Sequence, residues 1–384
     1  MSWMSAEVAL ALLGTKPQTL YANVSRGRIA AKPDPEDPRR SLYRQEDVER
    51  LAARHRGRRP AQAVAAESIA WGEPVLETAI STVAHGRLLY RGQNAMALAD
   101  KATLEDVAGL LWGGQHAVQH QHPLPGPPLK GDGATEPGQH GLRQAYRAVA
   151  ELAASDIPTV GRTRGVLLGD AARVLTTVAA ALAEPGDGPL HERLARQWGR
   201  PEAGDIIRAA LVLLAEHELN ASTFAARVTA STGAPLSAAV LAGLAALSGP
   251  LHGNASQSMA GLVAMAQQGG AEAAVGEYLR QGRPLPCFGH RLYADGDVRA
   301  EALLGRFEPP KLFAEIADIG TALSGEQPNI DFALAAMSAA FDLPEDAPLQ
   351  IFALARSVGW IAHALEQIET GALIRPRARY IGVS

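Results

Sequence analysis

Ser-Gly-Pro-Leu-His-Gly-Asn, residues 248–254, is the stretch around which the rest of the chain is organised. It follows the apolar run from Ala238 to Leu247, which predicts a helix that ends where Gly and Pro make the backbone turn. His252 stands in that turn. A histidine placed by turn chemistry either caps a helix or is held in a cleft as a functional group, and these seven residues alone leave both interpretations open.

The composition is typical of a large globular protein. The chain has 384 residues, of which 47% are hydrophobic and 20% are charged, and this length predicts roughly two or three domains. The single cysteine, Cys287, excludes an internal disulfide framework and fits a reducing compartment, so we expect a cytoplasmic protein. There is no secretory signal pattern and no uninterrupted run of about 18 apolar residues, so we expect neither export nor a membrane span.

The charge is unevenly distributed along the chain. Residues 1–60 contain 12 Lys and Arg against 7 Asp and Glu, whereas the whole chain has a net charge of −4. A basic segment joined to an acidic body suggests two functions, the basic part being able to approach a polyanion such as DNA. A solvated basic surface without a nucleic-acid partner is the plain alternative.

The first sixty residues show a helix-turn-helix pattern. Ser5 is placed to cap a helix that ends near Leu13, and Thr15 is placed to cap a second helix that stops at Gly27. A loop over 32–38 then leads to a basic strand or wing over 39–44. Side chains able to reach bases and phosphates are Gln18, Thr19, Tyr21, Arg26, Arg39 and Arg40.

These residues carry a resemblance over about fifty positions. The segment resembles the MerR/excisionase type of small winged helix-turn-helix domain through Leu13-Gly14, Thr19-Leu20-Tyr21, Ser25-Arg26-Gly27 and Tyr43-Arg44-x-x-Asp47-Val48. The resemblance implies DNA as a partner for residues 1–60, with the basic run 54–59 as a linker. A helical hairpin kept for protein contacts remains the alternative.

The body of the chain reads as mainly α. From 139 to 247 the pattern is helical almost throughout, rich in Ala and Leu and poor in β-branched residues. No phosphate-binding glycine loop and no fixed-period repeat occur. His116, His120 and His122 have a spacing that zinc sites use, but no carboxylate or thiolate lies close by in sequence, so we expect no metal.

Polar groups interrupt the apolar helices at a few places. The stretches are 216–222, 288–293 followed by Arg299, 328–332, 355–360 and 374–377. Taken singly, each fits a cap, a buried histidine or a surface ion pair. Together they provide arginines for carboxylates, histidines as hydrogen-bond donors and a carboxylate as base, which is the set that enol chemistry on a small polycarboxylate requires.

The same motifs resemble the citrate synthase family in their order. They are Tyr90-Arg91-Gly92, Glu216-His217-Glu218-Leu219-Asn220-Ala221-Ser222, Gly249-Pro250-Leu251-His252-Gly253, Gly289-His290-Arg291 with Asp297-x-Arg299, Asn329-x-Asp331, and Arg356-x-x-Gly359-Trp360. The resemblance covers about residues 66–384. It implies a helical homodimer, with a large domain over 66–252 and 346–384 and a small domain over 253–345.

The resemblance also implies roles for individual residues. Asp331 removes a proton from acetyl-CoA, His252 donates a hydrogen bond to the developing enolate oxygen, and His290 polarises the ketone of oxaloacetate. The carboxylates of oxaloacetate are bound by His217, Arg299, Arg356 and, from across the dimer interface, Arg375. Acetyl-CoA is a co-substrate, and the reaction needs no cofactor and no metal.

Four residues depart from the family pattern. Cys287 stands where the family usually has Gly, Val298 replaces a usual Pro, and Ser256 replaces a common Asn. Ala294 stands where relatives often carry a basic residue near the CoA phosphates. The acid–base groups are intact, so these departures bear on CoA affinity and turnover.

Three further functions stay open at this point. A 2-methylcitrate synthase would use propionyl-CoA in the same chemistry. A metabolite-sensing DNA-binding regulator would combine a weak or inactive synthase body with the basic N-terminal segment. Alternatively, residues 1–60 would only mediate assembly.

Overall fold

The chain folds into two compact units, Met1–Glu77 and Thr78–Ser384. The structure is a computed structural model, and it describes residues 3–13, 20, 23–24, 29–34, 37, 41–48, 76–84, 86–113, 141–249, 252–253, 255–293, 295–378, 380 and 382. Each unit has its own hydrophobic core, so the two are described separately.

The first unit contains a small antiparallel sheet and a helix. The elements are β1 (Trp3–Ser5), α1 (Ala6–Leu13), β2 (Ala31–Pro33) and β3 (Ser41–Arg44), and the strand order is β1-β3-β2. Ser5 accepts a hydrogen bond from the N–H of Val8 at 3.4 Å, as expected of a capping residue. The buried side chains are Met4, Ala9, Leu13, Leu20, Ile29, Tyr43 and Val48.

The predicted loop over 32–38 begins later than expected. Lys32 and Pro33 pair with Leu42 and Ser41 in the β2–β3 ladder, because the basic strand needs a partner for its backbone groups. Of the predicted second helix only residues 20, 23 and 24 are described, and they are helical. The six predicted DNA-contacting residues, Gln18, Thr19, Tyr21, Arg26, Arg39 and Arg40, lie outside the described residues.

The second unit begins with a three-stranded antiparallel sheet. The strands are β4 (Ser81–Ala84), β5 (Arg87–Tyr90) and β6 (Gln93–Asn94), in the order β4-β5-β6. Strand β5 pairs with both neighbours, and its pairing with β4 places Ser81 opposite Tyr90. This register places both side chains beside the end of a buried helix, where they contact Glu216.

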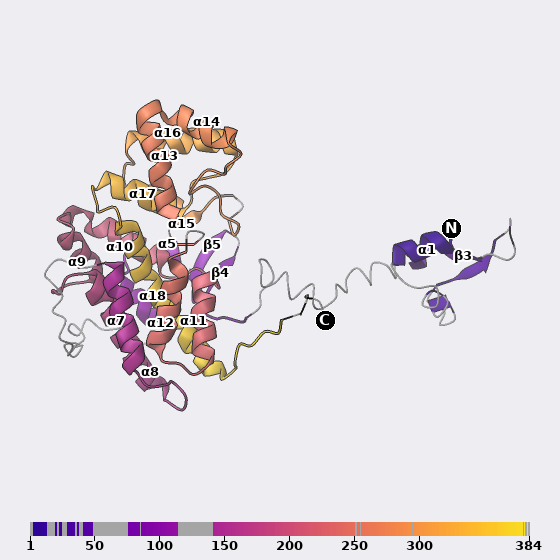
Figure 1. Ribbon diagram of the computed structural model, residues 1–384, viewed down its shortest axis with the longest axis horizontal. Coiled ribbons are helices and arrows are strands. Elements are labelled where there is room, and N and C mark those ends of the chain that lie inside the picture. Colours follow the sequence, from indigo (N-terminus) through magenta and orange to yellow (C-terminus); the bar gives the residue numbers. More distant parts are fainter. Residues whose placement is uncertain are drawn as a thin grey trace. The chain divides into compact units, whose positions relative to one another are not determined.

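Helices make up the rest of the second unit, as the sequence predicts (Figure 1). They are α5 (Ala95–Leu98), α6 (Leu104–Leu111), α7 (Leu142–Ser155), α8 (Arg164–Leu182), α9 (Leu190–Gln197), the 3₁₀ turn η1 (Pro201–Ala203), α10 (Gly204–Leu214), α11 (Ala221–Ser231), α12 (Leu236–Leu247), α13 (Ala255–Gly269), α14 (Ala271–Arg280), α15 (Val298–Leu304), α16 (Lys311–Ser324), α17 (Ile330–Ala340) and α18 (Ala347–Thr370). Figure 1 shows α13, α14 and α16 at one end of this unit and α7, α8, α11 and α12 at the other.

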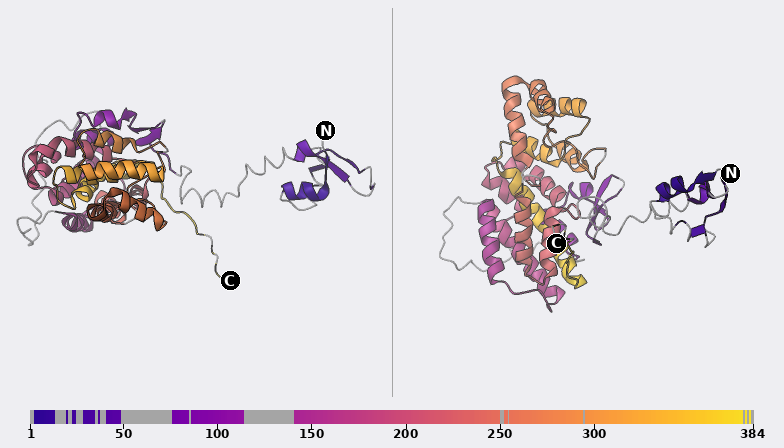
Figure 2. Two further views of the ribbon diagram at one scale, coloured as in Figure 1. Left: turned by 90° about the horizontal axis from the view of Figure 1, so that it is seen from above. Right: turned by 45° about the vertical axis from the view of Figure 1, so that its right-hand side comes forward.

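Helix α18 forms the centre of the larger group of helices (Figure 2). It is buried along nearly its whole length and packs against α6, α8, α10, α11, α12 and α17. A helix that is apolar all round belongs in a core rather than on a surface. The few polar residues on α18, among them Arg356 and His363, are therefore buried with it.

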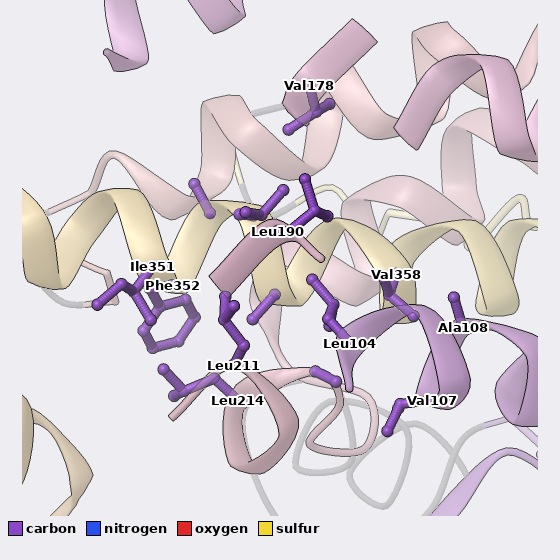
Figure 3. Close-up of a cluster of buried hydrophobic side chains, with 14 of the residues drawn as sticks. Leu104, Val107, Ala108, Val178, Leu190, Leu211, Leu214, Ile351, Phe352 and Val358 are labelled. Carbon is purple, nitrogen blue, oxygen red and sulfur yellow. The ribbon is translucent and has the colours of Figure 1, made fainter. Parts of the chain in front are cut away.

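Two hydrophobic cores lie within the second unit. The first contains side chains from α6, α10 and α18 among others, and Figure 3 shows Leu104, Val107, Leu211, Leu214, Ile351 and Val358 in it. The second is built from α13, α14, α16 and α17, with Cys287 at its edge. Helix α17 contributes to both cores, so a residue at its N-terminus lies where the two meet.

Helix α8 is long and apolar enough to cross a membrane by length and composition. Asp170 and Arg173 interrupt its apolar sequence. Its buried side chains belong to the first core, and it packs against α7, α12 and α18. This is the environment of a core helix.

Of the predicted turn at 248–254, residues 248–249 and 252–253 are described, and they lie in turns or a bend. Helix α12 ends at Leu247 and α13 begins at Ala255. The N–H of Gly253 donates to the carbonyl of Leu247 at 3.1 Å, and a Cβ at Gly253 would overlap that carbonyl. Glycine is therefore required here by close approach of the backbone, which fixes the position of His252.

Candidate active site

His252 is held by a hydroxyl from α11. Its Nε2 lies 2.8 Å from Ser222 Oγ, which is also 3.0 Å from Trp360 Nε1 and 2.8 Å from Asn220 Oδ1. Burial, together with the charge of Arg356, lowers the pKa of His252 to about 4. The imidazole is therefore neutral near pH 7 and carries a single proton.

His290 lies on a segment that is paired with the start of α17. The N–H of Gly289 donates to Gln327 O at 2.8 Å, and Asn329 Nδ2 donates to Gly289 O at 3.1 Å. The N–H of Leu292 donates to Nδ1 of His290 at 3.2 Å, so that nitrogen is the acceptor and Nε2 carries the proton. Burial and Arg299 lower the pKa of His290 to about 4.

Asp331 is in the first turn of α17. Asn329 caps this helix, its Oδ1 accepting from the N–H of Asp331 at 3.0 Å. Burial raises the pKa of Asp331 to about 6, although Arg299 opposes the shift. A carboxylate with such a pKa is largely ionised at pH 7 and more basic than an exposed aspartate, as a general base needs to be.

Arg299 is clamped by a neighbouring carboxylate. Its Nε and Nη2 donate to the two oxygens of Asp297 at 2.9 and 2.8 Å. Asp297 also accepts from the N–H of Ile330 at 3.0 Å, which ties α15 to the start of α17. Burial alone would raise the pKa of Asp297, but Arg299 holds it below its usual value.

Arg356 is a buried cation with an unused donor. It is 1% exposed, its Nε donates to Leu214 O at 2.8 Å, and its guanidinium lies 4.7 Å from the centroid of Phe352. Its Nη2 makes no hydrogen bond with the described residues. Burial lowers its pKa to about 10, so it is charged at pH 7 and suited to an incoming anion.

His217 connects these groups. Its Nε2 lies 2.9 Å from the hydroxyl of Tyr293, and its ring centroid is 5.0 Å from that of His290. Tyr293 lies 5.6 Å from the guanidinium of Arg299. Burial, followed by Arg299 and Arg356, lowers the pKa of His217 well below its usual value. His217 is therefore neutral and lies among the candidate cations.

A cavity of about 210 Å³ opens beside His290. It is lined by Gly289, His290, Tyr293, Asp295, Gly296, Gly325, Glu326 and Gln327. Because His290 carries its proton on Nε2, a carbonyl oxygen in this region can accept a hydrogen bond from it.

Several predicted residues are not part of this arrangement. Arg375 lies beyond the end of α18 and is exposed, and no described contact joins it to the other candidate residues. Ala294 and the predicted metal alternatives His116, His120 and His122 lie outside the described residues, and so do the side chain of Ser256 and the whole of Asn254. Among the described residues no group of His, Cys, Asp and Glu is arranged to hold a metal ion.

Three residues with clear roles in the geometry were given none from sequence. They are Ser222 and Asp297, which lie inside quoted motifs, and Tyr293, which lies in the polar stretch 288–293. The Asp-x-Arg spacing gave a usable signal for the clamp on Arg299. By contrast, Ser222 contacts His252 from 30 positions away, and Tyr293 contacts His217 from 76, so no local pattern shows these pairs.

Comparison with known proteins agrees with the geometry. Residues 144–377 match the family described as citrate synthase, C-terminal domain. The chain is 38% identical over 184 residues to citrate synthase 2 of Bacillus subtilis, a match that spans about half the length of that relative (50%) and 45% of this chain. It is 30% identical over 360 residues to 2-methylcitrate synthase of Shewanella oneidensis, covering 82% of this chain and 94% of that protein.

A solved structure extends this agreement to the fold. Citrate synthase of Thermoplasma acidophilum, in a ternary complex with carboxymethyl coenzyme A and oxaloacetate, superposes with a TM-score of 0.65 at 25% identity, covering 81% of this chain and 94% of that chain. The predicted mainly helical fold is thereby confirmed for the second unit. The chain belongs to the citrate synthase family.

Proposed function

We propose that the protein condenses an acyl-CoA with oxaloacetate, releasing free CoA. The single observation that carries this proposal is the combination of a carboxylate with a pKa of about 6, Asp331, and two half-buried neutral histidines, His252 and His290. The complex of the Thermoplasma relative with a CoA analogue and oxaloacetate supports the choice of substrates.

The chemistry explains why these groups are needed together. The α-proton of a thioester is very weakly acidic, so Asp331 can remove it only if the enolate oxygen is stabilised as it forms. His252 supplies that hydrogen bond, and His290 polarises the ketone that the enolate attacks. Base and donor each contribute on the order of 10² to 10⁴-fold in comparable enzymes.

We assign the binding of the oxaloacetate carboxylates to the cationic residues of the site and to His217. Arg299 and Arg356, with His217, would hold oxaloacetate, and the unbonded Nη2 of Arg356 offers a donor for this purpose. Arg375 would act from the partner subunit of a homodimer, which agrees with its exposure in a single chain.

The dimer and the two-domain division are further parts of the proposal. Helix α8 exposes the small residues Gly165 and Gly169, which let another helix approach closely, and the exposed Val166 lies between them. The second core lies wholly within 253–345 and supports a small domain there, with a hinge near Gly249 and Gly253. The large domain over 66–252 and 346–384 holds most of the first core, to which α15 and α17 also contribute. Closure would exclude water from the enolate.

A thiol-release assay tests the proposed reaction. With oxaloacetate and acetyl-CoA or propionyl-CoA, the protein should release free thiol, and Asp331→Asn or His252→Ala should abolish it. The ratio of the two rates distinguishes a citrate synthase, which we favour, from a 2-methylcitrate synthase, since relatives carry both names. Release that is unchanged in both variants would contradict the mechanism.

A second candidate function concerns residues 1–60. Their excess of Lys and Arg favours a winged helix-turn-helix domain that binds DNA and responds to metabolites bound by the synthase body. This requires a mobility shift of duplex DNA at low salt that changes with oxaloacetate. If no duplex shifts but deletion of residues 1–60 changes the oligomer mass, the segment serves assembly. We also assign the protein to the cytoplasm, on its single cysteine.

A further inference from the structure

Glu216 is a fully buried carboxylate next to the candidate site. Its Oε1 lies 3.0 Å from Ser81 Oγ and 3.0 Å from His363 Nε2. Its Oε2 accepts no hydrogen bond from the described residues. An added Cβ at Gly359 would overlap Oε2, so this oxygen lies against α18 one turn after Arg356. The carboxylate thus occupies space that only a glycine leaves open.

His363 does not neutralise this carboxylate. Arg227 Nη1 lies 3.3 Å from Nδ1 of His363, and a guanidinium can only donate hydrogen bonds. Nδ1 is therefore the acceptor, and the single proton is on Nε2, which donates to Glu216; the tautomer is assigned from this network. Arg227 in turn forms an ion pair with Glu366 at 2.9 Å. His363 therefore offers Glu216 a hydrogen bond through Nε2.

Arg356 is the candidate arginine on the same helix as Gly359, one turn before it. Within 4.0 Å, Arg356 forms no ion pair with any described carboxylate, whereas Arg299 is clamped on both sides by Asp297. Burial lowers the pKa of Arg356, and Glu216 is the largest influence that raises it. The two arginines of the site therefore differ. Arg299 is paired directly with a carboxylate, whereas Glu216 influences Arg356 without forming an ion pair with it.

We propose that Glu216 is the counter-charge of the carboxylate-binding site and limits the affinity for oxaloacetate. It offsets the positive potential at Arg356 without occupying the Nη2 donor that the substrate needs. A direct ion pair would compete with the substrate, while an unbalanced buried cation would bind substrate and product too tightly for turnover. The inference rests on the proposed function, because it takes oxaloacetate as the ligand.

Calorimetric titration of the full-length protein with oxaloacetate tests this proposal. Glu216→Gln keeps the shape and the contact with His363 but removes the charge, so the Kd should fall roughly tenfold. Two matched controls keep the charge. Glu216→Asp shortens the side chain, and Ser81→Ala removes a hydrogen bond to the same oxygen; both should leave the Kd within about twofold. The affinity for pyruvate, which has one carboxylate, should rise less in Glu216→Gln than the affinity for oxaloacetate.

An unchanged or higher Kd in a folded Glu216→Gln protein would overturn the proposal. If that variant does not fold, Glu366→Gln provides the test from the partly exposed end of the network. It removes the negative charge that faces Arg227, so the Kd should fall by a smaller factor, about twofold, and an unchanged or higher Kd would refute the proposal. If the unsubstituted protein neither binds oxaloacetate nor releases thiol, the proposed function itself is contradicted.

Discussion

At position 287 we expect glycine to give a more stable protein than alanine, which is the reverse of their usual effect on stability. Cys287 has φ of +63°, in the left-handed region, and is 7% exposed at the edge of the second core. A residue with a Cβ loses about 1 to 2 kcal/mol in this conformation, whereas glycine does not.

Both variants lose the buried sulfur, so they differ only in the Cβ methyl group and in its effect on the backbone. Cys287→Gly should be more stable than Cys287→Ala by about 1 kcal/mol, after subtraction of the greater freedom of glycine in the unfolded chain. Urea midpoints at equal m-values measure this difference. The matched control is Ala333→Gly in the buried interior of α17, which should be destabilised by about 1 kcal/mol. An alanine variant at 287 as stable as the glycine variant would refute the reasoning.

Further predictions concern the site and its turn. Thiol release should fall as the pH drops through about 6, because Asp331 must be ionised to act as base; a pH–rate profile flat from 5 to 8 would count against this role. The raised pKa of Asp331 also means that folding is favoured at low pH and loses stability as pH rises, so Asp331→Asn should be more stable than the parent at pH 8, by on the order of 2 kcal/mol in denaturant titrations. Arg356→Lys should raise the KM for oxaloacetate at least about tenfold with a small effect on the KM for acyl-CoA, since lysine lacks the planar donor pair; equal changes in both would contradict the assignment. Gly253→Ala should lower the free energy of unfolding by more than about 1 kcal/mol, because its Cβ would overlap the Leu247 carbonyl, and a neutral effect would show that the turn relaxes.

The sequence predicts the parts of the fold that depend on local patterns. The helical body and the turn at His252 follow from apolar spacing and from residues a few positions apart. The β4–β5 pairing does not follow from local patterns, because register depends on which segment is available as a partner, and Ser81 reaches Glu216 across 135 positions.

The buried polar contacts were beyond local reasoning. Trp360 meets Ser222 from 138 positions away, and His363 meets Glu216 from 147. Neither pair has a spacing or a shared motif that would indicate it. The motif residues could be predicted as a set. Only the three-dimensional arrangement shows which of them are paired with each other and which keep an unbonded donor.

The clamp between Arg299 and Asp297 has a consequence for the thermodynamics of ligand capture. A free arginine loses rotamer entropy when it grips a carboxylate, at a cost of about 0.5 to 1.5 kcal/mol per side chain. Arg299 loses that freedom while the chain folds, because Asp297 fixes its guanidinium in the unliganded protein. A dicarboxylate therefore meets a pre-organised anchor, and inhibitors that match its fixed orientation should gain affinity through slower dissociation.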